Sequence, residues 1–516
     1  MHSAPKNYSE YHKQLDEALE DKFLRNTLDT FAVAYRANRE TIFKEVDERG
    51  LIAQIADAKD DACRHMEELY AQFKEQAEKR GVHVHRAATA EEANAIIARI
   101  ARENDVKRVV KSKSMTAEEI QLNPYLEKEG LIVDETDLGE WIIQLRHEGP
   151  SHMVMPAIHL SRYQVAEDFT RETGVKQDAE DIQRLVKVAR VQLRRKFING
   201  DMGISGCNFA VAEMGAVSTV TNEGNARMVT TLPRVHVAIA GLDKLIPNLE
   251  VALTALQVLP RNATAQRLTA YVTFMAGAGE CRVCEDNKKI MHVVFLDNGR
   301  TEIARDPLFS QIFRCVRCGA CANVCPVFRL VGGHKMGYIY IGAIGLILTY
   351  FFHGHDKAKV LCQNCVGCES CKNVCAGGID LSLGAATSFG GVVCGKALKA
   401  GCSIPVAILL ALAVGLLIGL MNGVCIVKFK LPGFILTLGT QYCLNGIINV
   451  WTSGLSISNF AKEYTRIGQL RIGKVVPIPI VYAVIIALIG HIILTRSKLG
   501  RKILAVGGNE ETSRLA

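Results

Sequence analysis

Residues 315–326 read CVRCGACANVCP, and this short stretch decides how the second half of the chain is organised. Its cysteines follow the spacing C-x2-C-x2-C-x3-C, with a proline after the last: Cys315, Cys318, Cys321 and Cys325. That spacing is typical of the bacterial run that binds [4Fe–4S] clusters, because a tight loop directs three thiolates to three corners of one cube. The fourth cysteine of such a run reaches a second cluster. The stretch therefore predicts iron–sulfur chemistry and a partner motif elsewhere in the chain.

The partner motif is residues 365–376, CVGCESCKNVCA, with alanine at 376 where proline is usual. Because the last cysteine of each run serves the other cluster, two ligand sets are expected. Cluster one takes Cys315, Cys318, Cys321 and Cys375, and cluster two takes Cys365, Cys368, Cys371 and Cys325. Structural zinc is the weaker alternative, since zinc sites rarely need eight thiolates in two interleaved runs. Two neighbouring [4Fe–4S] clusters suit electron hopping, so the region predicts a redox relay.

The other cysteines are harder to assign. The chain has 17 cysteines in 516 residues, and its N-terminus, MHSAPKNYSEYHKQLDEALEDKF, contains no apolar signal segment. The first part is therefore expected in the cytoplasm, where cysteines serve metal or redox chemistry rather than disulfides. Cys362 could replace Cys365 as a ligand, although a bystander role is favoured. Cys281 and Cys284 form an isolated pair that cannot complete a metal site alone, which favours surface thiols.

The first 305 residues predict helices followed by an α/β domain. Residues 10–80 have apolar positions at helical spacing. From about residue 83, strands alternate with helices, which implies a mostly parallel sheet covered on both faces. One helix, TAEEANAIIARIARENDV, begins with Thr89 as its expected N-cap. Expected strands are GVHVHRA (81–87), KRVVKSKS (107–114), GLIVDETD (130–137), HMVMPAI (152–158), GAVSTVT (215–221), HVAIAGL (236–242) and a last one within 285–305.

Two polar stretches of this domain are candidate ligand-binding sites. Lys111, Ser112, Lys113 and Ser114 stand at a strand end before a helix start, where backbone N–H groups and two lysines suit an anion. The second stretch contributes loop residues: Glu213, Asn222, Glu223, Asn225 and Arg227. Turn chemistry with solvated charges is the alternative, and composition alone favours it. The phrase GISGCN lacks the context of a dinucleotide-binding fingerprint.

The C-terminal tail differs in charge and hydropathy from the rest of the chain. From Leu383 onward there are thirteen Lys and Arg, three Glu and no Asp, which gives the tail a net charge of about +10. Because the whole chain has a net charge of +8, the residues before the tail are close to neutral or slightly acidic. A basic, acid-poor, apolar segment indicates a membrane rather than nucleic acid. Residues 404–427 and 475–495 are long enough to span, and 434–451 is a weaker candidate. Residues 337–352 are too short, which favours a buried loop or short helix that shields a cofactor.

Several phrases resemble the lactate-utilisation iron–sulfur protein B family over about residues 10–380. They are KSKSMTAEEIQLN, ETDLGEWIIQL, PSHMVMPAIH, GISGCNFAVAEMGAVSTVTNEGNARMVTTLPRVHVAI, FLDNGR and RCVRCGACANVCPVFRLVGGHKMGYIYIGAIG. The resemblance implies an LUD α/β domain, with a fold like the CoA-transferase and ribose-isomerase group, joined to a ferredoxin-like region with two [4Fe–4S] clusters. It also implies an electron-transfer subunit of a cytoplasmic complex that oxidises L-lactate to pyruvate, rather than a complete enzyme. Other subunits would take the electrons first. Cys207, Met214 and Ala376 depart from the expected pattern.

The tail resembles a different family, the ribose/xylose-type ABC sugar permeases. The resemblance begins at GGIDLSLGA (377–385) and continues through IPVAILLALAVGLLIGLMNGVCIV to SKLGRKILAVGGNEETSRLA. The phrase GGIDL can end one motif and begin the other, so the chain is predicted to be a fusion joined there. A transport pathway needs more helices, a second copy and an ATPase, so a permease component is kept only as the alternative function. A transferase acting on CoA or a sugar phosphate rests on the LUD fold alone.

The predicted architecture has four parts. These are N-terminal helices (1–80), the LUD α/β domain (81–305), an α-helical ferredoxin-like two-cluster domain (306–382) and a partial all-α transmembrane region (383–516). Residues 1–382 are expected in the cytoplasm, with the cytoplasmic membrane reached through 404–495. Expected partners are the other subunits of a lactate-oxidising complex and its electron donor and acceptor, with no nucleic acid. No catalytic residue is assigned.

Overall fold

The computed structural model describes residues 8–279, 289–306, 309–365, 370–371, 374–375 and 382–428, together with 440, 443–444, 447, 450–451, 471–472 and 476–477. It divides into two compact units, Met1–Ile379 and Asp380–Ala516. The first unit contains the α/β sheet and the described cysteines of both motifs, and the second contains the apolar tail.

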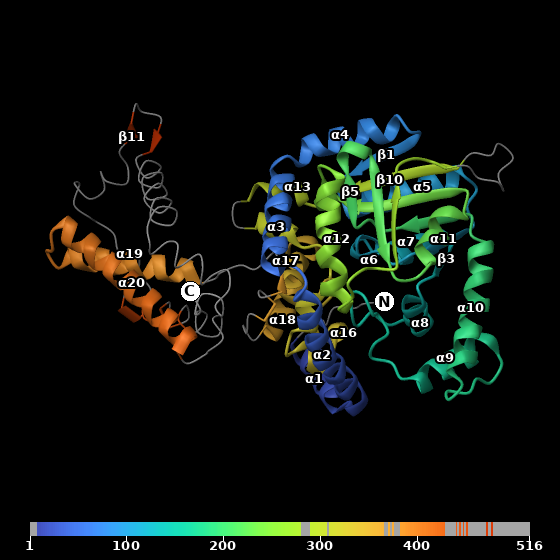
Figure 1. Ribbon diagram of the computed structural model, residues 1–516, viewed down its shortest axis with the longest axis horizontal. Helices are drawn as coiled ribbons and strands as arrows, with labels where there is room; N and C mark the ends of the chain where they lie inside the picture. The colour runs from blue at the N-terminus through green and yellow to red at the C-terminus, as the bar shows by residue number, and fades with distance from the viewer. Residues whose placement is uncertain are drawn as a thin grey trace. The chain divides into compact units, whose positions relative to one another are not determined.

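Four helices open the first unit, as the helical spacing of residues 10–80 predicts: α1 (Tyr8–Glu20), α2 (Lys22–Phe43), α3 (Glu48–Arg64) and α4 (Met66–Glu78). Asp21 and Asp47 cap α2 and α3, because each carboxylate accepts a backbone N–H of the first helical turn. Figure 1 shows α3 beside α12 (Leu249–Thr264), and Ile55 packs there with Ala255 and Val258.

A six-stranded sheet forms the centre of the unit, and all of its described pairings are parallel. Its order is β1 (Val82–Ala87), β10 (Ile290–Leu296), β7 (Val235–Gly241), β4 (Met202–Ser205), β2 (Arg108–Lys111) and β3 (Ile132–Glu135). The expected mostly parallel sheet is therefore confirmed. Every residue of β7 is buried, which is typical of a parallel strand covered on both faces.

Helices follow most of these strands and cover the sheet. They are α5 (Ala90–Glu103), α6 (Met115–Glu119), α7 (Leu122–Lys128), α8 (Leu138–Arg146), α9 (Arg162–Thr173), α10 (Ile182–Ile198), α11 (Asn225–Thr231) and α13 (Arg300–Arg305). Thr89 caps α5, since its hydroxyl accepts the N–H of Glu92 at 3.3 Å, as predicted. Apolar residues of α5 and α7, such as Ile97 and Leu126, pack with Val109 and Val294 of the sheet.

One expected strand is wrong. Residues 152–158, HMVMPAI, form turns rather than a strand. The ring nitrogen Nδ1 of His152 accepts the N–H groups of Val154 and Met155, at 2.9 and 3.1 Å, and Ser151 donates its N–H to the carbonyl of Pro156. The backbone donors that a strand would offer to a neighbour are therefore used inside the loop.

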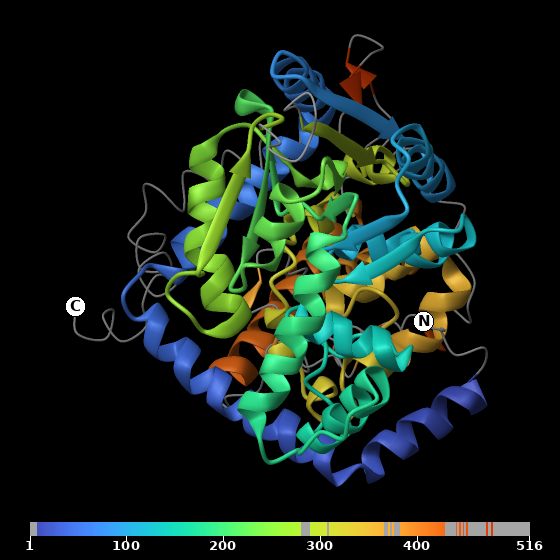
Figure 2. The same ribbon diagram turned by 90° about the vertical axis from the view of Figure 1, so that its right-hand side faces the viewer.

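The expected strand GAVSTVT (215–221) is confirmed as β6, but it belongs to a second, four-stranded sheet that the sequence did not predict. Its order is β8 (Leu245–Ile246), β5 (Phe209–Val211), β6 (Ala216–Thr221) and β9 (Tyr271–Met275). Figure 2 shows its longer strands in green beside α12. A 3-10 turn at Ala212–Met214 joins β5 to β6 within this sheet, and another at Leu242–Lys244 joins β7 of the first sheet to β8.

The cysteine-rich region packs directly on the α/β core. It comprises 3-10 turns at Ser310–Arg314 and Cys362–Asn364, and α14 (Ala320–Asn323), α15 (Phe328–Val331), α16 (Gly333–Met336), α17 (Gly342–His353) and α18 (His355–Leu361). Phe313 and Leu348 share one buried cluster with Phe295 of β10. The expected short buried helix within 337–352 is confirmed as α17.

The second unit contains α19 (Ser382–Lys399), α20 (Ile404–Lys428) and a short pair, β11 (Arg471–Ile472) and β12 (Val476–Pro477). Within the described part of the chain, one helix is long and apolar enough to cross a membrane, at Ile404–Asn422 with mean hydropathy 2.8. It falls in the first expected span, 404–427. The candidate span 475–495 and most of 434–451 lie outside the described residues.

Candidate iron–sulfur site and adjoining cavity

The loop of the first cysteine motif is shaped by two residues in the left-handed region. Arg317 has φ 60° and Gly319 has φ 78°. This curvature turns Cys315, Cys318 and Cys321 toward one cavity, which Cys375 of the second motif also lines. The four thiols expected to bind cluster one thus line the same space, although two separate motifs supply them.

The wall of this cluster-one cavity is mostly apolar, although Asn262, Arg314 and Arg317 also line it. Ile55 of α3, Val258 of α12 and Ile344 and Leu348 of α17 line it. At Gly342, a Cβ would lie less than 3.0 Å from the Sγ of Cys321, so only glycine leaves that thiol its place. Four thiols in a mostly apolar shell fit an iron–sulfur cube, whose properties depend on thiolate ligands and solvent exposure.

The thiols need a metal to ionise here. Burial raises the pKa of Cys318 to about 11, and burial together with the neighbouring thiols of Cys375 and Cys315 holds the pKa of Cys321 well above its usual value. A metal ligand must be a thiolate, so binding a cluster would release protons. Among the described side chains, no three His, Cys, Asp or Glu lie close enough to hold a single metal ion. A cube of four irons is larger than one ion and needs ligands spread around a cavity.

The second motif is described only in part. Cys325 and Cys371 are half-buried and Cys365 is exposed, whereas Cys368 lies outside the described residues. Cys371 interacts electrostatically with Cys321 and contributes to its raised pKa, which indicates that the second motif lies close to the first. Cys362, just before the second motif in the sequence, is exposed. Cys281 and Cys284 also lie outside the described residues.

A larger cavity of about 370 Å³, the LUD cavity, unites most of the other candidate residues. Its lining includes members of both polar stretches: Ser112, Lys113, Ser114, Asn222, Glu223 and Asn225. Ser114 also caps α6, because its hydroxyl accepts the N–H of Ala117 at 3.2 Å. The end of β2 in the six-stranded sheet and the end of β6 in the four-stranded sheet therefore bring together two polar stretches that are far apart in the sequence.

Three candidate residues lie elsewhere. Lys111 is buried and forms ion pairs with Glu135 at 2.7 Å and Glu118 at 3.2 Å. Glu213 accepts the N–H of Leu249 at the start of α12, at 2.7 Å. Arg227 lies over the ring of Tyr271, 5.2 Å from its centroid. Each of these residues has a structural contact of its own.

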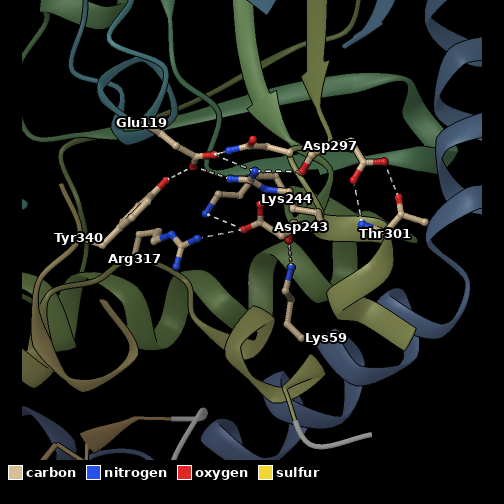
Figure 3. Close-up of polar contacts among 10 residues, drawn as sticks. Lys59, Glu119, Asp243, Lys244, Asp297, Thr301, Arg317 and Tyr340 are labelled. Atoms are coloured by element: carbon tan, nitrogen blue, oxygen red, sulfur yellow. Dashed lines mark hydrogen bonds and ion pairs between the residues drawn. The ribbon is translucent and has the colours of Figure 1, made fainter. Parts of the chain in front are cut away.

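Sequence reasoning missed a buried ionic network beside the LUD cavity (Figure 3). Arg300 is its centre: its Nε lies 2.6 Å from Asp243 Oδ1, and its Nη2 lies 2.6 Å from Glu119 Oε2. Tyr340 donates its hydroxyl to Glu119, and Lys59 donates to the carbonyl of Asp243. Glu119, Arg300 and Tyr340 each lie in a phrase that carries the family resemblance, but nothing in those phrases shows that the three side chains meet, so only the folded arrangement reveals the network.

Two further cations complete this network. Arg317, from the cluster-one loop, lies 3.4 Å from Asp243 Oδ2, and Lys244 Nζ lies 3.9 Å from the same atom. Burial opposes ionisation of Asp243, but Arg300, Lys244 and Arg317 outweigh it and hold its pKa well below the usual range. Burial lowers the pKa of Lys244 to about 8.

The fold and the cysteines define a class of protein. The LUD domain family matches residues 70–296, and the 4Fe-4S dicluster domain family matches residues 311–379. The chain is thus an iron–sulfur protein of the LUD class. It is 40% identical to lactate utilization protein B of Shouchella clausii, over 71% of this chain and 77% of that protein. The chain belongs to the lactate utilization protein B family.

Other relatives agree with this assignment. Lactate utilization protein B of Bacillus subtilis is 38% identical over 71% of this chain and 76% of its own length. A protein of Escherichia coli named "Uncharacterized electron transport protein YkgF" is 38% identical over 72% of this chain and 78% of its own. The tail is different: residues 374–516 match a permease component of the branched-chain amino acid transport system family. The permease-like tail expected from the sequence is therefore present.

Proposed function

We propose that this chain is the electron-transfer subunit of a complex that oxidises L-lactate to pyruvate. The observation that carries the proposal is the single cavity lined by Cys315, Cys318, Cys321 and Cys375. Membership of the lactate utilization protein B family supports lactate as the compound that the complex acts on. The name of the Escherichia coli relative, which refers to electron transport, supports the role.

We assign the ligands in two sets, as the spacing predicts. Cluster one takes Cys315, Cys318, Cys321 and Cys375; cluster two takes Cys365, Cys368, Cys371 and Cys325. When bound, each cluster accepts and releases one electron at a time. The chain's own residues hold the thiolates in place, and the apolar side chains of α3, α12 and α17 exclude water from cluster one.

The proposed partners are the other subunits of that complex, with an electron donor and an electron acceptor on either side of the two clusters. We place residues 1–382 in the cytoplasm and keep the domain boundaries 1–80, 81–305, 306–382 and 383–516. The described division of the chain at Ile379 falls close to the last of these boundaries.

The test is the metal content of the full chain purified without oxygen. We expect about eight irons per chain and absorbance near 400 nm that bleaches on reduction. Cys375→Ser should lower the iron content to about half, because one cluster loses a ligand. Cys362→Ser is the matched control and should leave the iron unchanged. Zinc in place of iron, or no metal, would overturn the proposal.

The tail supports a second candidate function, a membrane permease component. The match to a permease family and the apolar helix at Ile404–Asn422 favour it. Under this alternative the tail would insert into the cytoplasmic membrane and support ATP-dependent uptake of a small polar substrate. Uptake that depends on the tail in whole cells, with unchanged iron content, would favour the alternative.

A further inference from the structure

The LUD cavity shares a wall with the cluster-one cavity. Met153, Arg317 and Cys318 line both of them. A molecule bound in the LUD cavity would therefore contact residues that also surround cluster one. Lys244 and Arg317 interact electrostatically with the thiol of Cys315 as well. The two cavities are therefore adjacent, and the cations of one interact electrostatically with a thiol of the other.

In the ionic network that reaches this shared wall through Arg317, the cations outnumber the carboxylates. Four cations with little exposed side chain contact Asp243, and one of them, Arg300, also pairs with the second buried carboxylate, Glu119: Lys59, Lys244, Arg300 and Arg317. Among the described residues, the one carboxylate paired with Lys244 is Asp243, at 3.9 Å, which Arg300 already holds at 2.6 Å. The side chain of Lys244 is 9% exposed. A buried ammonium with three donors and one distant partner favours an additional anion.

The rest of the lining suits an organic molecule with an apolar body. Leu259, Pro260 and Met155 supply apolar surface. Toward the other end of the cavity, the carboxylate of Glu223 interacts electrostatically with Asp137 and Lys113. Ser112 and Asn225 also line the cavity there, and their polar side chains can form hydrogen bonds with a ligand. The volume of about 370 Å³ lies within the usual range for small-molecule sites.

We propose that the LUD cavity binds a small organic anion, with its carboxylate or phosphate on Lys244 and Arg317, and that this binding is coupled to the redox state of cluster one. The coupling rests on the proposed function, because it requires the cluster. Reduction adds a negative charge to the cluster, next to the cations that would hold the anion. Binding therefore disfavours reduction, and reduction weakens binding by the same factor.

The experiment uses the iron-loaded full chain and four probes: pyruvate, L-lactate, inorganic phosphate and coenzyme A. Isothermal titration calorimetry measures each affinity with the clusters oxidised and then reduced by dithionite. We expect at least one probe to bind fivefold or more tightly to the oxidised protein. A tenfold difference corresponds to a cluster-one midpoint about 59 mV lower with the probe bound. The carboxylate and phosphate arms identify which group is recognised.

Lys244→Met should weaken binding at least tenfold. Lys289→Met is the matched control, since Lys289 is a half-buried lysine whose Nζ is buried and whose pKa is also lowered to about 8 by burial, but it does not line the cavity. Lys244→Arg should keep most of the affinity, because it keeps the positive charge. This variant therefore distinguishes loss of the charge from misfolding as the cause of weaker binding. If no probe binds the oxidised, iron-loaded chain, the anion site is refuted and the cations only offset the cluster's charge. Equal affinity in both redox states refutes the coupling, whereas missing iron refutes the proposed function instead.

Discussion

A single methyl group added at Gly342 should remove cluster one. Gly342 has φ +80°, which L side chains rarely adopt, and its Cβ would lie less than 3.0 Å from the Sγ of Cys321. The backbone cost of such a conformation is about 1–3 kcal/mol. Overpacking adds about 1–3 kcal/mol when the neighbours must move. Because the atom that must move is a cluster ligand, we expect Gly342→Ala to lower iron from about eight per chain to about four.

Gly354, at the other end of α17, provides the matched control. Its φ is +88°, yet a Cβ there meets nothing within 4 Å. Gly354→Ala therefore carries a comparable backbone cost without the clash, and it should keep its iron. Iron analysis and urea denaturation of both variants measure the difference, which we expect to be about 1–3 kcal/mol. If Gly342→Ala holds as much iron as Gly354→Ala and unfolds at the same urea concentration, Cys321 does not point where the structure places it.

Three further predictions concern stability and location. Glu119→Gln should destabilise the first unit by about 3–5 kcal/mol in urea denaturation, because Arg300 would keep a buried charge with one carboxylate partner fewer; an effect below about 1 kcal/mol would contradict the network. Burial lowers the pKa of His152 to about 4 and that of His236 to about 3, so both are neutral when folded. The unfolded chain binds more protons below about pH 6.5, and the urea midpoint should fall steadily from there toward pH 4; a flat profile would contradict this. Ending the chain at residue 382 should keep the iron while abolishing any membrane association, measured by fractionation beside the full chain; iron loss on truncation would contradict the division near Ile379.

The sequence predicted the parts of the fold that depend on local pattern. The strand VHVAIAG and the helix cap at Thr89 depend on residues that are close together in the sequence, and both form as expected. The phrase HMVMPAI looked like a strand because alternation alone cannot show that His152 takes up the neighbouring N–H groups. Strands of two or three residues, such as β8 and β5, are too short to give a pattern.

The candidate site divides in the same way. Cysteine spacing grouped Cys315, Cys318 and Cys321 with Cys375, and these four line one cavity. The cations were not predictable, because Lys59, Lys244 and Arg300 come from separate elements and only meet around Asp243 in the folded chain. The available signals were Arg317 inside the cysteine loop and Arg300 at the end of the family phrase FLDNGR, since an arginine that becomes buried needs a carboxylate partner.

The junction with the tail has a physical consequence for the redox site. The matches to the dicluster and permease families overlap at residues 374–379. Cys375, the last proposed ligand of cluster one, falls inside this overlap, and every other proposed ligand precedes it. Both ligand sets are thus complete in sequence before the tail begins at Asp380. Cluster assembly requires thiolates and an apolar shell, and the shell of cluster one comes from α3, α12 and α17, all within the first unit. The redox chemistry should therefore be independent of what the tail does, and iron bound by the chain truncated at residue 382 is the measurement that separates the two.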